Sequence, residues 1–243
     1  NPLSREVVRC AIEAARGADL LYAFKALPES LGVAVRVGKA LDLPVALHLC
    51  DWDAGYFSDR SLARRIWYGL RGLTDPSGPV ALRLAEKLIP RADVLTVSST
   101  ALQRRFGGDV VPQGVDTEAI FPDAFPREAA RARLGIKPGE LLVLFLGTPV
   151  PHKGLLDLAR AWRALDRPGV RFMIVGAGLA GDELLALPEF AGAELHPPVP
   201  VDEAPWVIRA ADVYAVPQRD TPFARHQLPA KLLLGMALGA PCI

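Results

Sequence analysis

A loop bounded by two glycines, with one lysine near its end, combines residue types that could bind a phosphate. Residues 147–154 read GTPVPHKG, between an apolar run and a helical pattern. The free N–H groups and positive dipole end of a helix start favour a phosphate, and Lys153 adds a point charge. Gly147 and Gly154 permit close backbone approach. The Walker pattern GxxxxGK[ST] is absent, so an ordinary strand-to-helix connection with a solvated Lys153 is the alternative.

A second glycine pair, Gly176 and Gly178, directly follows another apolar run. Glycines in such a turn allow a ligand to approach the backbone. The stretch lacks the third glycine and the ribose-binding acid of a dinucleotide fingerprint, which disfavours NAD. A glycine pair alone is weak evidence, and a tight turn is the alternative explanation of the same residues.

A polar loop from Pro217 to Gln227 follows a predicted strand. Polar side chains at the carboxyl end of a strand in an open α/β sheet are placed to contact a sugar or a phosphate, and a solvated surface loop is the alternative. Lys231 lies in the first turn of the next predicted helix, where a cation opposes the helix dipole and indicates an anionic neighbour. The polar residues of the loop are Gln218, Arg219, Asp220, Thr221, Arg225, His226 and Gln227.

In the first half of the chain, His48 and Asp51 are the candidates. His48 and Cys50 share one face of a predicted strand, and a packed histidine is the alternative to a catalytic base. Asp51 and Asp53 have the Asp-x-Asp spacing that can hold a divalent metal, although three residues are a weak match. The 3 Cys and 4 His are dispersed, with no CxxC, so we expect reduced thiols and no zinc site.

The candidates are separated by apolar runs that alternate with amphipathic stretches, which indicates βαβ units and parallel sheets. The pattern lapses from 113 to 127, a stretch rich in proline and acids that is typical of a linker. We therefore expect two Rossmann-like, doubly wound domains at 1–115 and 125–243. The predicted strands are 19–24, 44–50, 92–97, 109–112, 141–146, 170–175, 193–195 and 212–216, with another opening at 239–241. The predicted helices are 5–16, 30–41, 60–73, 79–89, 99–106, 128–134, 153–165, 182–187, 202–209 and 229–238.

Composition limits the classes of partner. The chain is 51% hydrophobic and 23% charged with a net charge of +1, which fits a folded α/β protein and disfavours a nucleic-acid partner. No apolar run is long enough to cross a membrane, and we expect a cytoplasmic protein. The helix predicted at 60–73 is basic and aromatic, so it could lie on an anionic membrane at the inner face. Its alternative is a surface helix packed on the core.

Several stretches, in their order and spacing, resemble the retaining GT-B glycosyltransferases of family 4, "glycosyl transferases group 1". The end of the first predicted domain, ADVLTVSSTALQRRFGG followed by VVPQGVDTEAIFP, is similar to the signature that closes the first domain of that family. RARLGI, LLVLFLGTP and HKG are similar to the start of its donor domain. The stretches 174–178, 211–217 and 229–243 continue the resemblance, which covers most of the chain and is strongest from residue 92 onward.

The resemblance implies an enzyme that transfers a sugar, with retention, from a nucleotide-diphosphate donor to a glycan, lipid or small-molecule acceptor. Lys153 would hold the diphosphate, with Gly147 and Thr148 shaping its site. The loop from Pro217 to Gln227 and the next helix would surround the donor sugar and ribose, while the first domain would bind the acceptor. Neither a metal nor another cofactor is required, because cations and helix dipoles would stabilise the departing diphosphate.

The sequence also departs from the family pattern. Thr148 stands where the family has an arginine, and His226 and Leu234 stand where it has two glutamates. Arg225, Gln227 or Lys231 could compensate. Two alternatives therefore stay open: a GT-B-like module that binds a nucleotide or partner without turnover, and a sugar-nucleotide epimerase. From the resemblance we also expect both domains to be incomplete, with segments missing before Asn1 and after Ile243.

Overall fold

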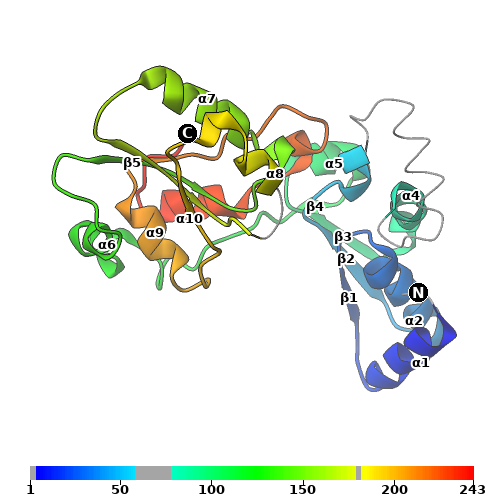
Figure 1. The fold of residues 1–243 in the computed structure, drawn as a ribbon. Helices are drawn as coiled ribbons and strands as arrows, with labels where there is room; N and C mark the ends of the chain where they lie inside the picture. Colours follow the sequence, from blue (N-terminus) through cyan, green and yellow to red (C-terminus); the bar gives the residue numbers. More distant parts are fainter. Residues whose placement is uncertain (1–3, 58–77, 179–181) are drawn as a thin grey trace. The chain divides into compact units, whose positions relative to one another are not determined.

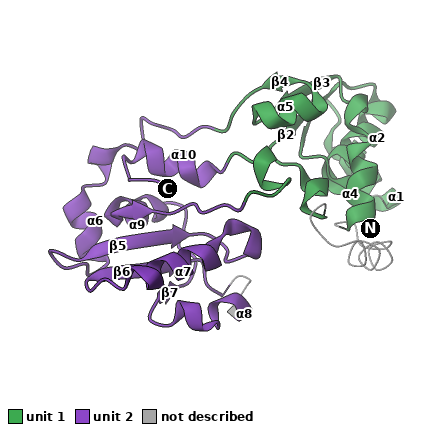
Figure 2. Ribbon diagram, turned by 90° about the horizontal axis from the view of Figure 1, so that it is seen from above, with its two compact units in different colours: residues 1–113, 220–228 green, residues 114–219, 229–243 purple. Residues whose placement is uncertain are grey.

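The computed structural model describes residues 4–57, 78–178 and 182–243, and these form two compact units. Unit 1 comprises residues 1–113 and 220–228, and unit 2 comprises residues 114–219 and 229–243 (Figures 1 and 2). Residues 220–228 therefore pack with the first unit, whereas the sequence places them in the second predicted domain. The helix expected at 60–73 lies outside the described residues, and so does its expected membrane contact.

Unit 1 contains a parallel four-stranded sheet in which the strands follow their chain order, β1-β2-β3-β4. Parallel strands need crossover connections, and helices supply them here. The strands are β1 (Leu21–Phe24), β2 (Val45–Leu49), β3 (Val94–Val97) and β4 (Asp109–Val110). The helices are α1 (Arg5–Ala14), α2 (Val33–Leu41), α4 (Pro79–Glu86) and α5 (Thr100–Phe106). Short helical turns lie at Pro28–Gly32, Asp53–Phe57 and Ile89–Arg91.

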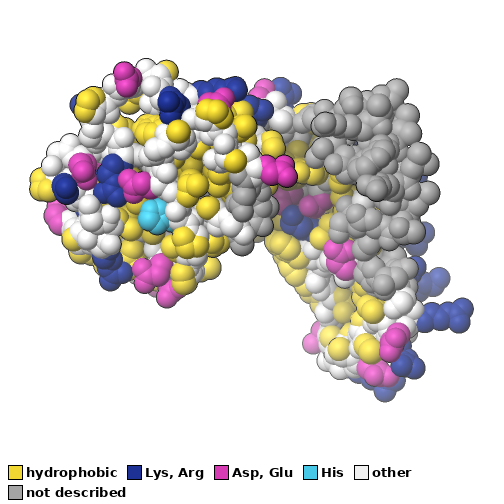
Figure 3. Space-filling model, in the orientation of Figure 1, with side chains coloured by type: hydrophobic (Ala, Val, Ile, Leu, Met, Phe, Trp, Pro, Cys, Tyr) yellow, Lys and Arg dark blue, Asp and Glu magenta, His cyan; other side chains and the backbone are white. Residues whose placement is uncertain are grey.

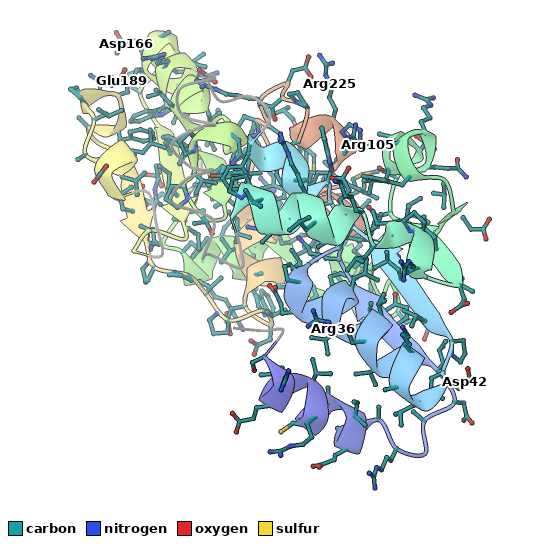
Figure 4. The ribbon with its side chains drawn as sticks, turned by 90° about the vertical axis from the view of Figure 1, so that its right-hand side faces the viewer. Arg36, Asp42, Arg105, Asp166, Glu189 and Arg225 are labelled. Carbon is teal, nitrogen blue, oxygen red and sulfur yellow. The ribbon has the colours of Figure 1, made fainter. Side chains whose placement is uncertain are left out.

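Local sequence explains where the helices of unit 1 begin and end. The side chain of Ser4 accepts a hydrogen bond from the N–H of Val7, and Ser99 caps α5 through Leu102 in the same way. Asp42 ends α2 in the left-handed conformation, and Figure 4 shows it at the tip of that helix. The core of the unit packs on one face of the sheet, on Ala23, Val45, Leu47, Leu49 and Val97.

Unit 2 contains a second parallel sheet, in the order β7-β6-β5-β8. The chain adds β6 and β7 on one side of β5 and then crosses to place β8 on its other side. The point between β5 and β8 is therefore a topological switch point, where open α/β sheets bind their ligands. The strands are β5 (Leu141–Leu146), β6 (Val170–Val175), β7 (Glu194–His196) and β8 (Val213–Tyr214).

Helices cover both faces of this sheet (Figure 2). One face packs against α6 (Arg127–Arg133), α9 (Ala204–Ala210) and α10 (Ala230–Ala237). The other packs against α7 (Leu155–Leu165) and α8 (Asp182–Leu185). Short 3₁₀ turns of unit 2 lie at Pro122–Ala124, Pro151–Lys153 and Pro188–Phe190, while the turn at Ala224–His226 belongs to unit 1. Burial on both faces explains why β5 is a continuous apolar run and why β6 is apolar apart from Arg171, and the sequence delimited both strands correctly.

The differences from the predicted elements include three in the type or the start of an element. The helix predicted to begin at Lys153 begins at Leu155, because Gly154 is left-handed and separates it from the turn at Pro151–Lys153. Ser30 lies in a π-helical turn that precedes α2. The strand predicted after Gly239 is a single parallel bridge between Tyr214 and Cys242.

Charges of both signs are interspersed over the face of each unit drawn in Figure 3, in keeping with the net charge of +1. None of the helices in the described part of the chain is both long and apolar enough to cross a bilayer.

Candidate functional site

The loops that follow β5 and β8 meet at the switch point of unit 2. Gly154 is left-handed, with a φ of 68°, and a Cβ on it would lie 1.6 Å from the carbonyl oxygen of Pro217. The N–H of Arg219 donates a hydrogen bond to the carbonyl of His152 at 3.0 Å. The guanidinium of Arg219 binds both carboxylate oxygens of Asp157, at 2.7 and 2.9 Å. The two loops therefore form one connected structure at the carboxyl end of the sheet.

Lys153 is held at this structure by the turn that precedes α7. The turn at Pro151–Lys153 ends at Gly154, and the N–H groups of Asp157 and Leu158 bond back to the Gly154 carbonyl. Burial lowers the pKa of Lys153 below its ordinary value. A lysine whose charge is penalised by burial gains from a bound anion, so its position suits a phosphate ligand.

Gly147 brings a second lysine to the same place. A Cβ on Gly147 would lie 2.4 Å from the Nζ of Lys231 and 3.6 Å from the Nζ of Lys153. The ammonium group of Lys231 donates a hydrogen bond to the carbonyl of Leu146 at 2.9 Å. Burial, with the charge of Lys153 as a second cause, lowers the pKa of Lys231 to about 8. Two cations from different elements therefore converge beside a glycine that leaves room for them.

No carboxylate neutralises this pair within the parts of the chain that the structure describes. The ion pairs found there involve neither Lys153 nor Lys231. Two partly buried ammonium groups that repel each other without a counter-ion are unfavourable in isolation. The arrangement has the charge and the space to bind an anion.

The glycines after β6 support the same loop. A Cβ on Gly176 would lie 2.4 Å from the carbonyl oxygen of Gly147, so a side chain there would displace the loop. Gly178 has a φ of 84°, and a Cβ on it would have no atom within 4 Å, so its backbone conformation alone favours glycine. Thr148 is half-buried in this loop and brings no charge to it.

In unit 1, a lysine and two aspartates meet at the carboxyl ends of neighbouring strands. Lys25 follows β1, and its Nζ lies 2.6 Å from Asp51 Oδ2 and 3.1 Å from Asp53 Oδ1. Burial alone would lower the pKa of Lys25, but the hydrogen bond to Asp51 and the charges of both aspartates outweigh burial and raise it. The Asp-x-Asp pair therefore binds an ammonium group. No cluster of three or more His, Cys, Asp or Glu suited to a metal is found among the described residues.

His48 lies in a packed environment beside this cluster. Its ring stacks on Phe24 with centroids 5.6 Å apart, and its Nδ1 lies 2.9 Å from the hydroxyl of Thr96. Burial lowers the pKa of His48, which favours the neutral ring. Burial, with the charge of Asp51 next, raises the pKa of Cys50 to about 12, so its thiol stays protonated at neutral pH. These contacts fit the packed-histidine alternative and an unreactive thiol.

The predicted site residues of 220–228 belong to unit 1. Gln227 donates to Asp51 Oδ1 at 2.8 Å, so the segment is tied to the lysine–aspartate cluster. His226 lies edge-on to Trp52, and its Nδ1 is 2.6 Å from the carbonyl of Pro222. Arg225 pairs with Asp220 on the surface and points outward in Figure 4. The predicted site residues are thus divided between unit 2, which holds the glycine loop with its two lysines, and unit 1, which holds the polar residues of 220–228 with His48 and Asp51.

Sequence reasoning missed Lys25. A signal was present, because Lys25 directly follows a predicted strand in the same way that Asp51 follows the next one. Leu234, which the sequence singles out as a departure, packs against the core of unit 2 and presents no polar group to a ligand.

Known proteins resemble the chain in both sequence and fold. Residues 140–243 match the family model described as "Glycosyl transferases group 1". The D-inositol 3-phosphate glycosyltransferase of Nocardia farcinica is 39% identical over 183 residues, which cover 65% of this chain and 40% of the relative. Its counterpart in Segniliparus rotundus is 35% identical over 147 residues, covering 56% and 31%. The matched part of the chain thus spans 31% to 40% of the length of these relatives.

Solved structures show the fold. HepE of Anabaena, in complex with UDP-glucose, matches with a TM-score of 0.72 and 21% identity, covering 97% of this chain and 62% of HepE. Sucrose-phosphate synthase of Thermosynechococcus elongatus matches with a TM-score of 0.71 and 18% identity, covering 98% and 60%. At these identities the likeness concerns the fold alone. The predicted class, two groups of α/β structure on parallel sheets as in GT-B glycosyltransferases, is confirmed.

Proposed function

We propose that this chain belongs to an enzyme that transfers a sugar from a nucleotide-diphosphate donor to an acceptor hydroxyl. The observation that carries the proposal is the glycine loop after β5, where Lys153 lies beside Gly147 at the switch point of the sheet. This loop lies within the segment that matches the glycosyltransferase family model. HepE, which shares the fold, binds UDP-glucose, and this supports a nucleotide sugar as the donor.

In this proposal Lys153 stabilises the negative charge that grows on the departing diphosphate. An ammonium group in a partly buried site is effective because low dielectric strengthens its interaction with the charge that develops during reaction. Gly147, Gly154 and Gly176 keep the backbone close to the phosphates, and Gly178 completes the loop that Gly176 begins. The reaction needs no metal or other cofactor, and the sugar is transferred with retention.

His226 and the residues around it supply the sugar side of the reaction in this proposal. Its Nδ1 lies within hydrogen-bond distance of the Pro222 carbonyl, so a neutral ring with its proton on Nδ1 leaves Nε2 as an acceptor for a sugar hydroxyl. Arg225 and Gln227 flank it. His48 and Asp51 lie on the acceptor side, where a glycan, lipid or small molecule binds. The enzyme acts in the cytoplasm, in glycan or cell-envelope assembly.

A thermal-shift panel of UDP, GDP, ADP and TDP tests the donor site, with Lys153→Ala beside the wild-type chain. We expect one nucleotide to raise the melting temperature of the wild type and to have little effect on the variant. The matching nucleotide sugar is then offered with candidate acceptors, and free nucleoside diphosphate is measured as the released product. Absence of a shift with all four nucleotides would count against the proposal. Binding without donor turnover would support the non-catalytic module, and an isomerised donor sugar would support the epimerase.

A further inference from the structure

We propose that Lys231 is a second phosphate-binding cation, and that a diphosphate bridges its ammonium group and that of Lys153 beside Gly147. The inference deepens the proposed function and rests on it. It adds a role for helix α10, since Lys231 comes from that helix while Lys153 precedes α7.

The geometry of Gly147 carries the argument. The Nζ atoms of Lys231 and Lys153 lie 2.4 and 3.6 Å from the position that a Cβ on Gly147 would occupy. Gly147 is the first residue after β5, and its φ of 150° belongs to the region that favours glycine. A side chain here would displace the end of the flexible Lys231 side chain. Gly147 therefore leaves room for both ammonium groups beside the backbone, where a ligand can reach them.

The charges around the pair indicate what the ligand is. The single protein partner found for the Lys231 ammonium in the described ranges is the neutral carbonyl of Leu146, at 2.9 Å. Lys153 contributes repulsion, and the N-terminal end of α10 is itself positive. A buried lysine with these neighbours is a poor structural anchor, because an apolar residue would fill the space at lower cost. A ligand with two linked negative charges offsets the cost of burial and of mutual repulsion for both lysines at once.

Calorimetry of the 243-residue chain with inorganic pyrophosphate and with UDP tests the inference. The variants are Lys231→Met and Lys153→Met, with Lys137→Met as the matched control, because Lys137 is an exposed lysine of the same unit. We expect each of the first two to weaken pyrophosphate binding at pH 7 by about tenfold or more, as loss of a charge-assisted hydrogen bond does. The control variant should bind as the wild type does.

Proton uptake on binding distinguishes a lysine that binds phosphate from a lysine with a structural role. Near pH 8.5 part of the Lys231 population is neutral, so an arriving anion draws a proton onto it. Titrations in two buffers with different heats of ionisation should show uptake of a fraction of a proton by the wild type, and less by Lys231→Met. Lys231→Gln repeats the comparison if the methionine variant does not fold.

The outcomes separate the inference from the proposed function. Equal pyrophosphate affinity and equal proton uptake in Lys231→Met and the wild type would overturn the inference, while UDP binding that depends on Lys153 alone would leave the function standing. Pyrophosphate binding that needs both lysines, with no nucleoside diphosphate bound more tightly, would support the pair and count against the function. A wild type that binds neither probe would overturn both.

Discussion

Gly154 lies so close to Pro217 that a Cβ on the glycine would be 1.6 Å from the carbonyl oxygen of the proline. The contact joins the loop after β5 to the loop after β8, the two loops that carry the proposed donor site. It allows no other residue at position 154, because the backbone of Pro217 would have to move. The left-handed conformation of Gly154 adds a second, smaller cost to any substitution.

Gly154→Ala should therefore destabilise unit 2 and disturb the lysine site. We expect a loss of about 3 kcal/mol or more in the free energy of unfolding, from the clash and the left-handed backbone together. Urea denaturation followed by circular dichroism measures it. Gly139→Ala is the matched control, since Gly139 is also left-handed but has nothing within 4 Å of a Cβ, and it should cost only about 1 kcal/mol. Equal losses in the two variants would show that the contact with Pro217 is unimportant.

Tyr214→Phe should leave unit 2 as stable as before or stabilise it by about 1 kcal/mol. The Tyr214 hydroxyl is fully buried and finds no hydrogen-bond partner among the described residues. An unpaired buried hydroxyl costs free energy that phenylalanine avoids while it keeps the ring. The melting temperature of the variant tests this, with Tyr22→Phe as the control because Tyr22 is 64% exposed. A marked loss of stability in Tyr214→Phe alone would indicate a partner for the hydroxyl, such as a buried water.

The sequence predicted the sheets well and the site only in part. Apolar runs such as 141–146 and 170–175 are unambiguous because strands buried on both faces are dominated by apolar residues. The sequence placed Lys153, Gly147 and Lys231 near the donor loop through their positions after strands and at helix starts. It could not show that Lys231 reaches Gly147, because that contact depends on how α10 packs across the sheet. The roles predicted for these residues stay predictions.

The packing of residues 220–228 with unit 1 was also hidden from the sequence. Local patterns place this segment between β8 and α10, both of which belong to unit 2. Its attachment depends on contacts between residues far apart in the chain, such as the hydrogen bond from Gln227 to Asp51 and the ring contact between His226 and Trp52. Such pairs leave no periodic signal in one sequence. Lys25 was missed although its place directly after a predicted strand was a signal, and its pairing with Asp51 and Asp53 of the next strand connection could not be seen in the sequence.

Asp212→Ala should destabilise unit 2 by about 2 kcal/mol, because it removes the shared partner of three donors. Asp212 binds Arg127 at 2.6 Å, Arg131 at 2.9 Å and the N–H of Leu142 at 2.7 Å. About a quarter of its side chain is exposed, so solvent screens part of the effect. Chemical denaturation measures the loss. Glu203→Ala removes the half-exposed pair with Arg133 and should change stability by less than about 0.5 kcal/mol. An equally small effect of Asp212→Ala would contradict a structural role for this network.

Lys231→Met should stabilise the unliganded chain at neutral pH while it weakens diphosphate binding. The pKa of Lys231 is lowered in the folded chain from an ordinary value of 10.5 to about 8, so the unfolded chain holds its proton more tightly. The charged Lys231 therefore lowers the free energy of unfolding. This cost is complete below about pH 8 and disappears as the pH rises toward 10.5, because in that interval folding releases a proton. Loss of the hydrogen bond from Lys231 to the Leu146 carbonyl partly offsets the gain that the variant makes. We expect a net gain on the order of 1 to 2 kcal/mol at pH 7.

The pH dependence makes this prediction specific to the ammonium group. Denaturation of the wild type and the variant across pH 6 to 10 should give a stability difference that is largest below about pH 8 and shrinks above it. Diphosphate affinity should fall in the wild type as the pH rises through the same range, because the anion binds the protonated lysine. The charged group that acts on Lys231 in the described chain is Lys153, whose pKa is also lowered. Loss of the Lys153 charge at high pH changes stability and diphosphate affinity in the same direction as loss of the Lys231 charge. A variant less stable than the wild type at every pH would show that Lys231 is a structural anchor, with the Leu146 carbonyl as its main partner.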